Sequence, residues 1–268
     1  MAHSDFAISD SELESLARLA GRDVGEVRAE LRRRPWSLHD LLADPALVEA
    51  VLEPASILVT PGPFALFAVL VRQAADDVLD REYVNDWVGP RSRLPVFDVE
   101  PLQELVIAPG RLLFIARLLT SMVAPTPVSP VPTTDPWELL DWVNAVDEDD
   151  RAVVFRRMGD LSLFLAGVQA DAHGATPLTE DQAKKVARLL DAGVDEILEL
   201  ADPRSVSPGL DALEELGARS YQQARRVEPN APPVIGDIAQ RIRPARRFLT
   251  HLADRFLSPY EQTWGLAA

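Results

Sequence analysis

Signals for the start of a helix recur along this chain, and they constrain its fold more than any other feature. Three segments begin with an acceptor side chain, followed three residues later by a side chain that returns the hydrogen bond. This arrangement satisfies free N–H groups in the first helical turn. The three segments begin at Ser9, Asp135 and Thr179, and weaker versions begin at Ser37 and Ser207. We therefore expect a helix to begin at each position.

Apolar residues repeat at helical spacing in the same regions. Between residues 149 and 169 they recur at intervals of four and three, which places them on one stripe of a helix. Further stripes cover residues 210–224 and 238–256, and Pro244 should kink or split the last one. Strand signals are confined to residues 83–99, where a short hairpin or an extended loop is expected. The sequence predicts an all-α fold, a multi-helix bundle-like domain.

Five prolines fall between Pro125 and Pro136, a density that excludes a helix and favours a polyproline-like path. At about 3.1 Å per residue, such a path is long enough to link two domains or to strap one. Because strongly apolar segments flank it on both sides, we favour a Pro-rich strap at 124–136. We divide the chain into an N-terminal helical hairpin lobe at 1–53 and a main helical domain at 54–268.

The composition is that of an acidic protein. The chain has 42 acidic and 27 basic residues, a net charge of −15, which argues against a grip on nucleic acid by the whole surface. It has no cysteine, which excludes a disulfide, a thiolate nucleophile and a Cys-ligated metal. The most apolar run, at 57–71, is shorter than the roughly 20 residues that a bilayer requires. We expect a cytoplasmic protein without a membrane span, and the two lysines among 27 basic residues suggest a bacterial source.

One carboxylate pattern is similar to that of helical isoprenoid synthases, in which a DDxxD helix face holds Mg²⁺ against a diphosphate. Its members here are Asp76, Asp77 and Asp80. The second metal motif of those enzymes is missing, because Asn85-Asp86 lacks the following Ser and Glu. A solvated helix end is the favoured interpretation. No histidine spacing suits a metal and no cofactor fingerprint occurs, so we assign no cofactor and no catalytic residue.

Residues 16–27 resemble a helix-turn-helix. Ala17, Gly21 and Val27 have the spacing that lets two short helices pack across a tight turn. The candidates for contacts with DNA phosphates follow the second helix and are Arg32, Arg33 and Arg34. The acidic residues of that helix have the wrong charge for DNA and are Asp23, Glu26 and Glu30. A hairpin used for packing or docking is therefore favoured over DNA binding.

The densest basic cluster consists of Arg225, Arg226, Arg241, Arg243, Arg246 and Arg247. Its last four members cover one side of a predicted helix whose other side is apolar. Residues 125–203 include 16 acids and 6 bases, whereas residues 204–268 include 7 acids and 9 bases. We expect the arginines to form a solvated face that pairs with the acidic segment. Recognition of an anionic ligand or partner is the alternative.

Two glycine-containing motifs lie some fifty residues apart, GDLSLFLAG at 159–167 and LGARSY at 216–221. Two helices could approach closely at Ala166-Gly167 and Gly217-Ala218, which lack bulky side chains. A polar seam would then form from Asp160, Ser162, Arg219 and Tyr221. A buried Asp160 requires a partner, either Arg219 or the Tyr221 hydroxyl, and we interpret the seam as a structural clasp rather than a catalytic site. Together the motifs resemble a GDxSLFxxG…LGxxxY pattern of uncharacterised bacterial all-helical proteins. The resemblance covers the C-terminal half and implies a family without an activity.

Three function hypotheses follow. The first is a non-enzymatic cytosolic protein that binds a protein partner, or a second copy of itself, through an apolar or arginine-bearing helix face. The second is a DNA-binding regulator that uses residues 9–34, and the third is a Mg²⁺-dependent prenyl-type enzyme. The sequence identifies neither the partner nor the oligomeric state.

Overall fold

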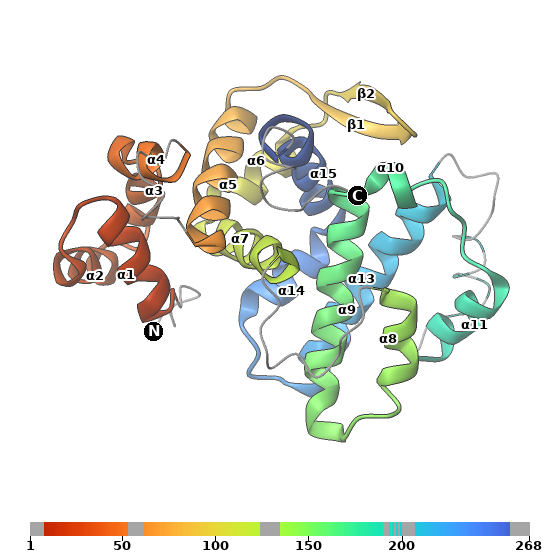
Figure 1. Cartoon of the computed structure of the whole chain (residues 1–268). Coiled ribbons are helices and arrows are strands. Elements are labelled where there is room, and N and C mark those ends of the chain that lie inside the picture. Colours follow the sequence, from red (N-terminus) through yellow and green to blue (C-terminus); the bar gives the residue numbers. More distant parts are fainter. Residues whose placement is uncertain are drawn as a thin grey trace. The chain divides into compact units, whose positions relative to one another are not determined.

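In a computed structural model of the chain, residues 8–52, 62–123, 135–189 and 207–257 are described, with isolated positions between 193 and 199. Helices dominate these residues, and the sheet among them has two strands (Figure 1). The all-α prediction is confirmed. Most of the predicted Pro-rich strap, 124–134, lies outside the described residues.

The chain forms two compact units. Unit 1 comprises residues 1–81, 103–126 and 255–267, and unit 2 comprises residues 82–102, 127–254 and 268. The chain therefore leaves unit 1 after Arg81 and returns to it twice. The predicted lobe at residues 1–53 lies within unit 1.

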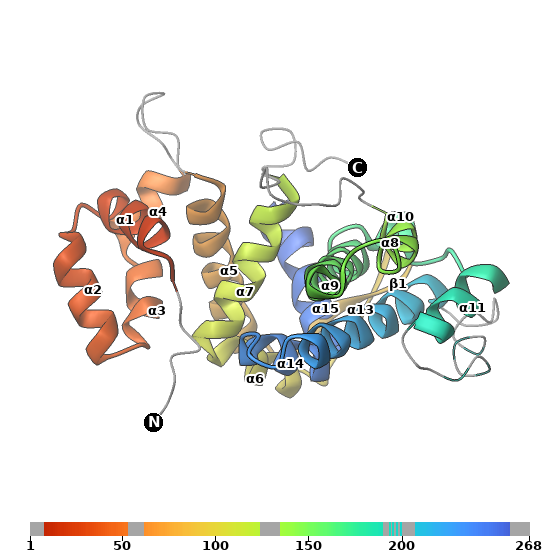
Figure 2. The same ribbon diagram turned by 90° about the horizontal axis from the view of Figure 1, so that it is seen from below.

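Unit 1 is built around a buried central helix. Its helices are α1 Asp10–Leu19, α2 Val24–Arg33, α3 Ser37–Leu42, α4 Pro45–Leu52, α5 Pro63–Leu79 and α7 Pro109–Val123, with the end of α6 Glu100–Ile107. Every side chain from Ala65 to Val71 is buried, so α5 has no solvent-facing side over this stretch. Helix α7 packs along α5 (Figure 2), and α1, α3 and α4 also contact α5.

Unit 2 holds the hairpin and the remaining helices. Its elements are β1 Val84–Gly89, β2 Ser92–Val96, α8 Pro136–Trp142, a 3₁₀ turn Glu148–Asp150, α9 Arg151–Gly167, α10 Ala170–His173, α11 Glu180–Leu189, α13 Pro208–Val227, α14 Pro233–Gln240 and α15 Ile242–Leu252. A π-helical turn, Ala253–Leu257, follows α15. The strands pair antiparallel, so the chain forms the hairpin rather than the extended loop.

A helix begins at or directly after each of the five predicted positions. Ser9 forms the capping box with Glu12, Asp135 caps α8, and Ser207 precedes α13. Thr179 exchanges hydrogen bonds with Gln182 at the start of α11.

A helix also begins at Ser37, the fifth position, but the expectation that Ser37 caps it is wrong. Trp36 occupies the N-cap, and Ser37 is the first residue of α3. The Ser37 hydroxyl donates to the Arg34 carbonyl at 2.7 Å instead of accepting from a helix N–H. The side chain therefore fixes the segment that precedes the helix.

Pro244 splits its helix as predicted. Helix α14 ends at Gln240 and α15 begins at Ile242. A proline at position 244 has no N–H, and in a continuous helix its ring would clash with the carbonyl of Gln240. The break at Arg241 removes both conflicts.

Helices α9 and α13 form the core of unit 2 and lie side by side in both views (Figures 1 and 2). Of the small residues predicted to lie between these helices, Gly217 does face α9, where a Cβ would lie 3.4 Å from the Cβ of Ser162. The tightest contact was not predicted and occurs at Gly159, where a Cβ would lie 2.6 Å from two carbons of the Tyr221 ring. The expectation that Gly167 faces α13 is wrong. A Cβ at position 167 would lie 2.5 Å from the Cβ of Leu249, so Gly167 instead allows α15 to approach α9.

Among the described residues, no single helix is both long and apolar enough to cross a membrane. Helices α6 and α7 reach the required length only as a pair, and the pair is bent by 88° between Ile107 and Pro109. Residues 57–61 of the predicted buried run at 57–71 lie outside the described residues, and residues 65–71 are buried within α5.

The contact between Gly159 and Tyr221 predicts a measurable difference between two glycines. Gly159→Ala should lower the free energy of unfolding by about 1–3 kcal/mol, because the added methyl group forces the buried ring aside. Gly217→Ala on the facing helix is the matched control. Its Cβ would meet ordinary contacts at 3.4 Å, so alanine's helix propensity should leave stability equal or raise it by up to about 1 kcal/mol. Equal losses in urea unfolding would contradict the packing described.

Candidate functional site

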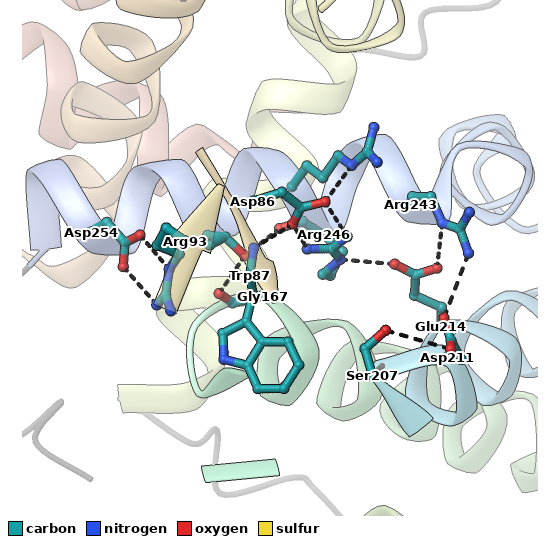
Figure 3. A network of polar contacts seen from close by, with 12 residues as sticks. Asp86, Trp87, Arg93, Gly167, Ser207, Asp211, Glu214, Arg243, Arg246 and Asp254 are labelled. Atoms are coloured by element: carbon teal, nitrogen blue, oxygen red, sulfur yellow. Dashed lines mark hydrogen bonds and ion pairs between the residues drawn. The ribbon is translucent and has the colours of Figure 1, made fainter. Parts of the chain in front are cut away.

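Three charged side chains are buried together in unit 2, and they come from three different elements (Figure 3). They are Asp86 on β1, Glu214 on α13 and Arg246 on α15. Both terminal nitrogens of Arg246 donate to the Asp86 carboxylate, the Nη2–Oδ2 pair at 3.1 Å. The Nε–H of Arg246 donates to Glu214 Oε1 at 2.8 Å. One guanidinium therefore joins the hairpin to both helices.

Asp86 and Glu214 accept further hydrogen bonds from neighbouring groups. Asp86 also accepts from Arg247 Nε at 2.8 Å and from its neighbour's backbone N–H at 2.8 Å. Glu214 accepts from Arg243 Nε at 2.9 Å, and Arg243 lies 3.7 Å from Asp211. Three arginines thus face three carboxylates, and we call these six residues the arginine network. Its charges balance.

The network keeps its members ionised. Burial by itself raises the pKa of Asp86, but hydrogen bonds and positive charge from Arg246 and Arg247 outweigh burial and hold that pKa below its ordinary value. Burial alone lowers the pKa of Arg246, and its two carboxylate partners more than reverse the effect. A carboxylate with a lowered pKa is a weak proton acceptor. The network is therefore suited to holding structure rather than to proton transfer.

A second set of contacts fixes the hairpin turn. The Asp171 carboxylate on α10 accepts from the Trp87 indole N–H at 2.8 Å, from the Arg91 backbone N–H at 3.0 Å and from Arg93 at 3.0 Å. Arg91 adopts a positive φ of 57°, which the tight turn requires. Arg93 also donates to Asp254 at 2.9 Å (Figure 3). The turn of the hairpin and the middle of β1 are consequently tied to helices of unit 2.

The outer side of the hairpin leaves aromatic side chains in solvent. Tyr83 precedes β1 and is 43% exposed, and Phe97 follows β2 and is 70% exposed. Their ring centroids lie 5.7 Å apart. Pro95 is also exposed, and alternation along a strand places it on the same side as Phe97. We call these three residues the hairpin face.

Acidic residues border the hairpin face. They are all exposed and are Glu82, Asp98 and Glu100. None of the three makes an ion pair with any residue that the structure describes. The face is therefore apolar at its centre and negative at its edge.

The structure corrects the expectation for the basic cluster. Among the described residues, Arg243, Arg246 and Arg247 pair with carboxylates of β1 and α13, and Arg241 pairs with Asp237, rather than with the acidic segment 125–203. Nor is Arg246 solvated, since it is 4% exposed. The Arg225 guanidinium lies against Gly236, and Arg226 lines a hollow with Arg151.

A sequence signal for the network exists but is easily overlooked. Glu214 stands four residues after Leu210, and Arg246 stands four residues after Ile242. Both positions belong to the apolar stripe of their helix, where a charge must have a buried partner. The identity of that partner, Asp86, carries no comparable signal.

The predicted polar seam forms in part. The Tyr221 hydroxyl donates to Asp160 Oδ1 at 2.8 Å, so Tyr221 is the partner that the buried carboxyl requires. The other two members bond within their own helices instead, Ser162 to the Met158 carbonyl at 2.8 Å and Arg219 to Glu215.

The seam differs from the network in its electrostatics. Burial raises the pKa of Asp160, and the charge of Arg156, 4.0 Å away, offsets this effect only in part. Burial and the neighbouring carboxylate also raise the pKa of Tyr221 well above its ordinary value. Ionisation of Asp160 therefore weakens the fold, whereas ionisation of Asp86 supports it.

The three aspartates of the DDxxD pattern do not gather around a metal position. Asp77 binds Arg81 through two hydrogen bonds of 2.5 and 2.8 Å, and Asp76 lies 2.7 Å from Arg72. Asp80 is exposed at the end of α5. The part of the chain that the structure describes contains no group of three or more acidic or histidine side chains that could hold a metal ion.

The helix-turn-helix expectation is met in geometry. Helices α1 and α2 flank a turn in which Gly21 has a φ of 64°, and Ala17 and Val27 are buried between them. The candidate DNA contacts, Arg32, Arg33 and Arg34, are exposed at the end of α2. They stand apart from the arginine network in sequence and belong to unit 1.

Comparison of the chain with protein-family models, curated proteins and solved structures finds no match in any of the three. The resemblance to the GDxSLFxxG…LGxxxY pattern consequently stays a prediction.

The raised pKa of Asp160 predicts how two substitutions behave. Asp160→Ala should lower the free energy of unfolding by about 1–3 kcal/mol, because it leaves the buried Tyr221 hydroxyl without its acceptor. Asp160→Asn keeps an acceptor and cannot ionise. Wild-type stability from this group is present below the ordinary carboxyl pKa of about 4 and is lost as pH rises through the raised value. As pH rises above about 4, the free energy of unfolding of the Asn variant should therefore increase relative to that of the wild type, and a constant difference would contradict this account.

Proposed function

We propose that this chain is a non-enzymatic protein that acts by binding a protein partner, and that the hairpin face is the contact surface. The observation that supports this most is an exposed Tyr83–Phe97 pair on a hairpin that buried ion pairs hold in place. An isolated two-stranded hairpin is marginally stable in water. Fixing it against helices while leaving aromatic rings in solvent is a typical arrangement for recognition, because aromatic anchors dominate binding energy at protein interfaces.

The border of the hairpin face indicates the chemistry of the partner. Three exposed carboxylates within three residues of Tyr83 or Phe97 in sequence make no ion pair with a described residue, and the whole chain has a net charge of −15. A partner with an apolar centre and a rim of lysine or arginine would therefore be attracted over long range and oriented on contact. A second copy of this chain would bring like charges together, which disfavours a homodimer through this face.

Two observations favour binding over catalysis. The carboxylates of the arginine network are engaged by arginines, and Asp86 has a lowered pKa that makes it a poor base. Asp76 and Asp77 are likewise paired with Arg72 and Arg81, which opposes their use as Mg²⁺ ligands in a prenyl-type enzyme.

A photo-crosslinking experiment tests the proposal. A photoreactive phenylalanine analogue at position 97 should give an adduct of defined mass with one protein when irradiated in cells of the source organism. The same analogue at Ile107, which is 62% exposed and lies in unit 1, is the matched control and should not give it. Phe97→Ser should then weaken binding of the purified partner by about tenfold or more, because burial of a phenylalanine contributes about 1.5–3 kcal/mol.

Three results would count against the proposal. Adducts that are identical at positions 97 and 107 would show no special role for the hairpin face. An adduct between two copies of this chain would replace the proposed partner by a homodimer. A partner that binds the Phe97→Ser variant as tightly as the wild type would place the interface elsewhere.

A further inference from the structure

The end of α2 carries positive charge that nothing in the described structure neutralises. Arg32, Arg33 and Arg34 are exposed, and none of them makes an ion pair with a described residue. The other arginines of α1 and α2, with the turn between them, behave differently. Each has a carboxylate partner within 2.8 Å: Arg18 with Glu14, Arg22 with Glu30, and Arg28 with Asp10.

Ion pairs also neutralise some of the acidic residues near α2. Glu30, which opposes DNA binding in the sequence, is paired with Arg22, and Glu12 is paired with Arg117. The unpaired acids of α2 are at its beginning, where Asp23 caps the helix and Glu26 follows. At a rise of 1.5 Å per residue, Glu26 lies about 9 Å along the helix from Arg32. The two ends of α2 therefore have opposite charge.

An exposed aromatic ring stands directly beside the arginines. Trp36 is 63% exposed and follows the three arginines after a single proline. The backbone here is fixed, because the Arg34 carbonyl accepts from both the N–H and the hydroxyl of Ser37, at 2.9 and 2.7 Å. The ring and the guanidinium groups are thus presented on an ordered turn between α2 and α3.

We propose that residues 32–36 form a binding site for single-stranded nucleic acid. Proteins that bind single strands combine a basic surface for the phosphates with aromatic rings on which bases stack. The segment offers both within five residues. This inference is independent of the proposed function, because it concerns unit 1 and a different class of ligand.

The distribution of charge favours a single strand over duplex DNA. A helix-turn-helix reads base edges with the N-terminal residues of its second helix. In α2 those residues include Asp23 and Glu26, which repel the phosphates and oppose most contacts in the groove. The basic end is the opposite one. A stacking ring at that end is accessible to an unpaired base but not to a base within a duplex.

A membrane surface fits the segment less well. Insertion into an anionic bilayer uses an apolar helix face beside the basic residues. Between residues 8 and 52, Trp36 is the one large apolar side chain that the structure leaves exposed. A single ring cannot provide such a face.

A binding measurement with the purified full-length chain tests the site. The probes are a fluorescein-labelled oligothymidine of about 12 nucleotides, a duplex of equal length, and vesicles containing phosphatidylserine. The oligothymidine should bind, and the logarithm of its affinity should fall with the logarithm of salt concentration with a slope near 2, because three phosphate contacts to a single strand contribute about 0.7 each. Arg32→Ala, Arg33→Ala and Arg34→Ala combined should reduce the slope to near zero.

Variants at the ring separate stacking from charge. Trp36→Ala should weaken binding of the oligothymidine by about tenfold with the slope unchanged, and Trp36→Phe should restore most of the affinity. The matched control removes an equal charge from unit 2 by replacing Lys184, Lys185 and Arg226 with alanine, and it should bind as the wild type does. Equal or tighter binding of the duplex, binding of vesicles alone, an equal loss in the control, or no binding at about 50 mM salt would each overturn the proposal.

Discussion

A single guanidinium, that of Arg246, determines how the parts of unit 2 fit together. It is 4% exposed and forms hydrogen bonds with carboxylates from β1 and α13, which are 160 and 32 residues away in sequence, respectively. Removing such a charge from water costs several kcal/mol, and only well-placed opposite charges offset that cost. The side chain can therefore be buried only when the hairpin and both helices are in register. Loss of one partner would leave a buried charge without compensation.

The network explains why a two-stranded sheet persists in an otherwise helical protein. Arg246 and Arg247 hold the middle of β1 through Asp86, and Asp171 holds the turn through three donors. The hairpin needs no third strand to stabilise it. A rigid surface loses little conformational entropy on binding. The exposed rings of Tyr83 and Phe97 are therefore better suited to binding a partner than aromatic residues on a mobile loop would be.

The sequence is informative wherever the cause of a structure is local. The helix starts at Ser9 and Thr179 and the break before Pro244 follow from side-chain and backbone chemistry within one turn. The pairing of Asp160 with Tyr221 could be anticipated as well, since both motifs combine a buried stripe with small residues. The side of α9 that faces α13 is harder to predict from the sequence. Gly167 faces α15 instead, because the rotation of a helix about its axis depends on the packing of the whole core.

The candidate site was much less predictable. The periodicity of α15 places Arg246 on the apolar stripe, yet its proximity in sequence to Arg243 and Arg247 favoured a solvated basic face. The sequence around Asp86 contains no pattern that predicts its ion pair with Arg246, 160 residues away. Likewise, Tyr83 and Phe97 resemble ordinary strand residues until the three-dimensional arrangement shows how far both are exposed. Long-range ion pairs and exposure are properties of the assembled fold.

Hydrogen exchange of the hairpin amides tests most directly whether Arg246 holds this surface. Arg246→Met keeps the length of the side chain and removes its charge, and Arg247→Met, which loses one hydrogen bond to Asp86, is the control. Amides of β1 and β2 should exchange at least about tenfold faster in the Arg246 variant, while those of α5 and α7 in unit 1 keep wild-type protection, because local opening reports local stability. Unchanged protection of the hairpin, or an equal loss throughout both units, would contradict the account.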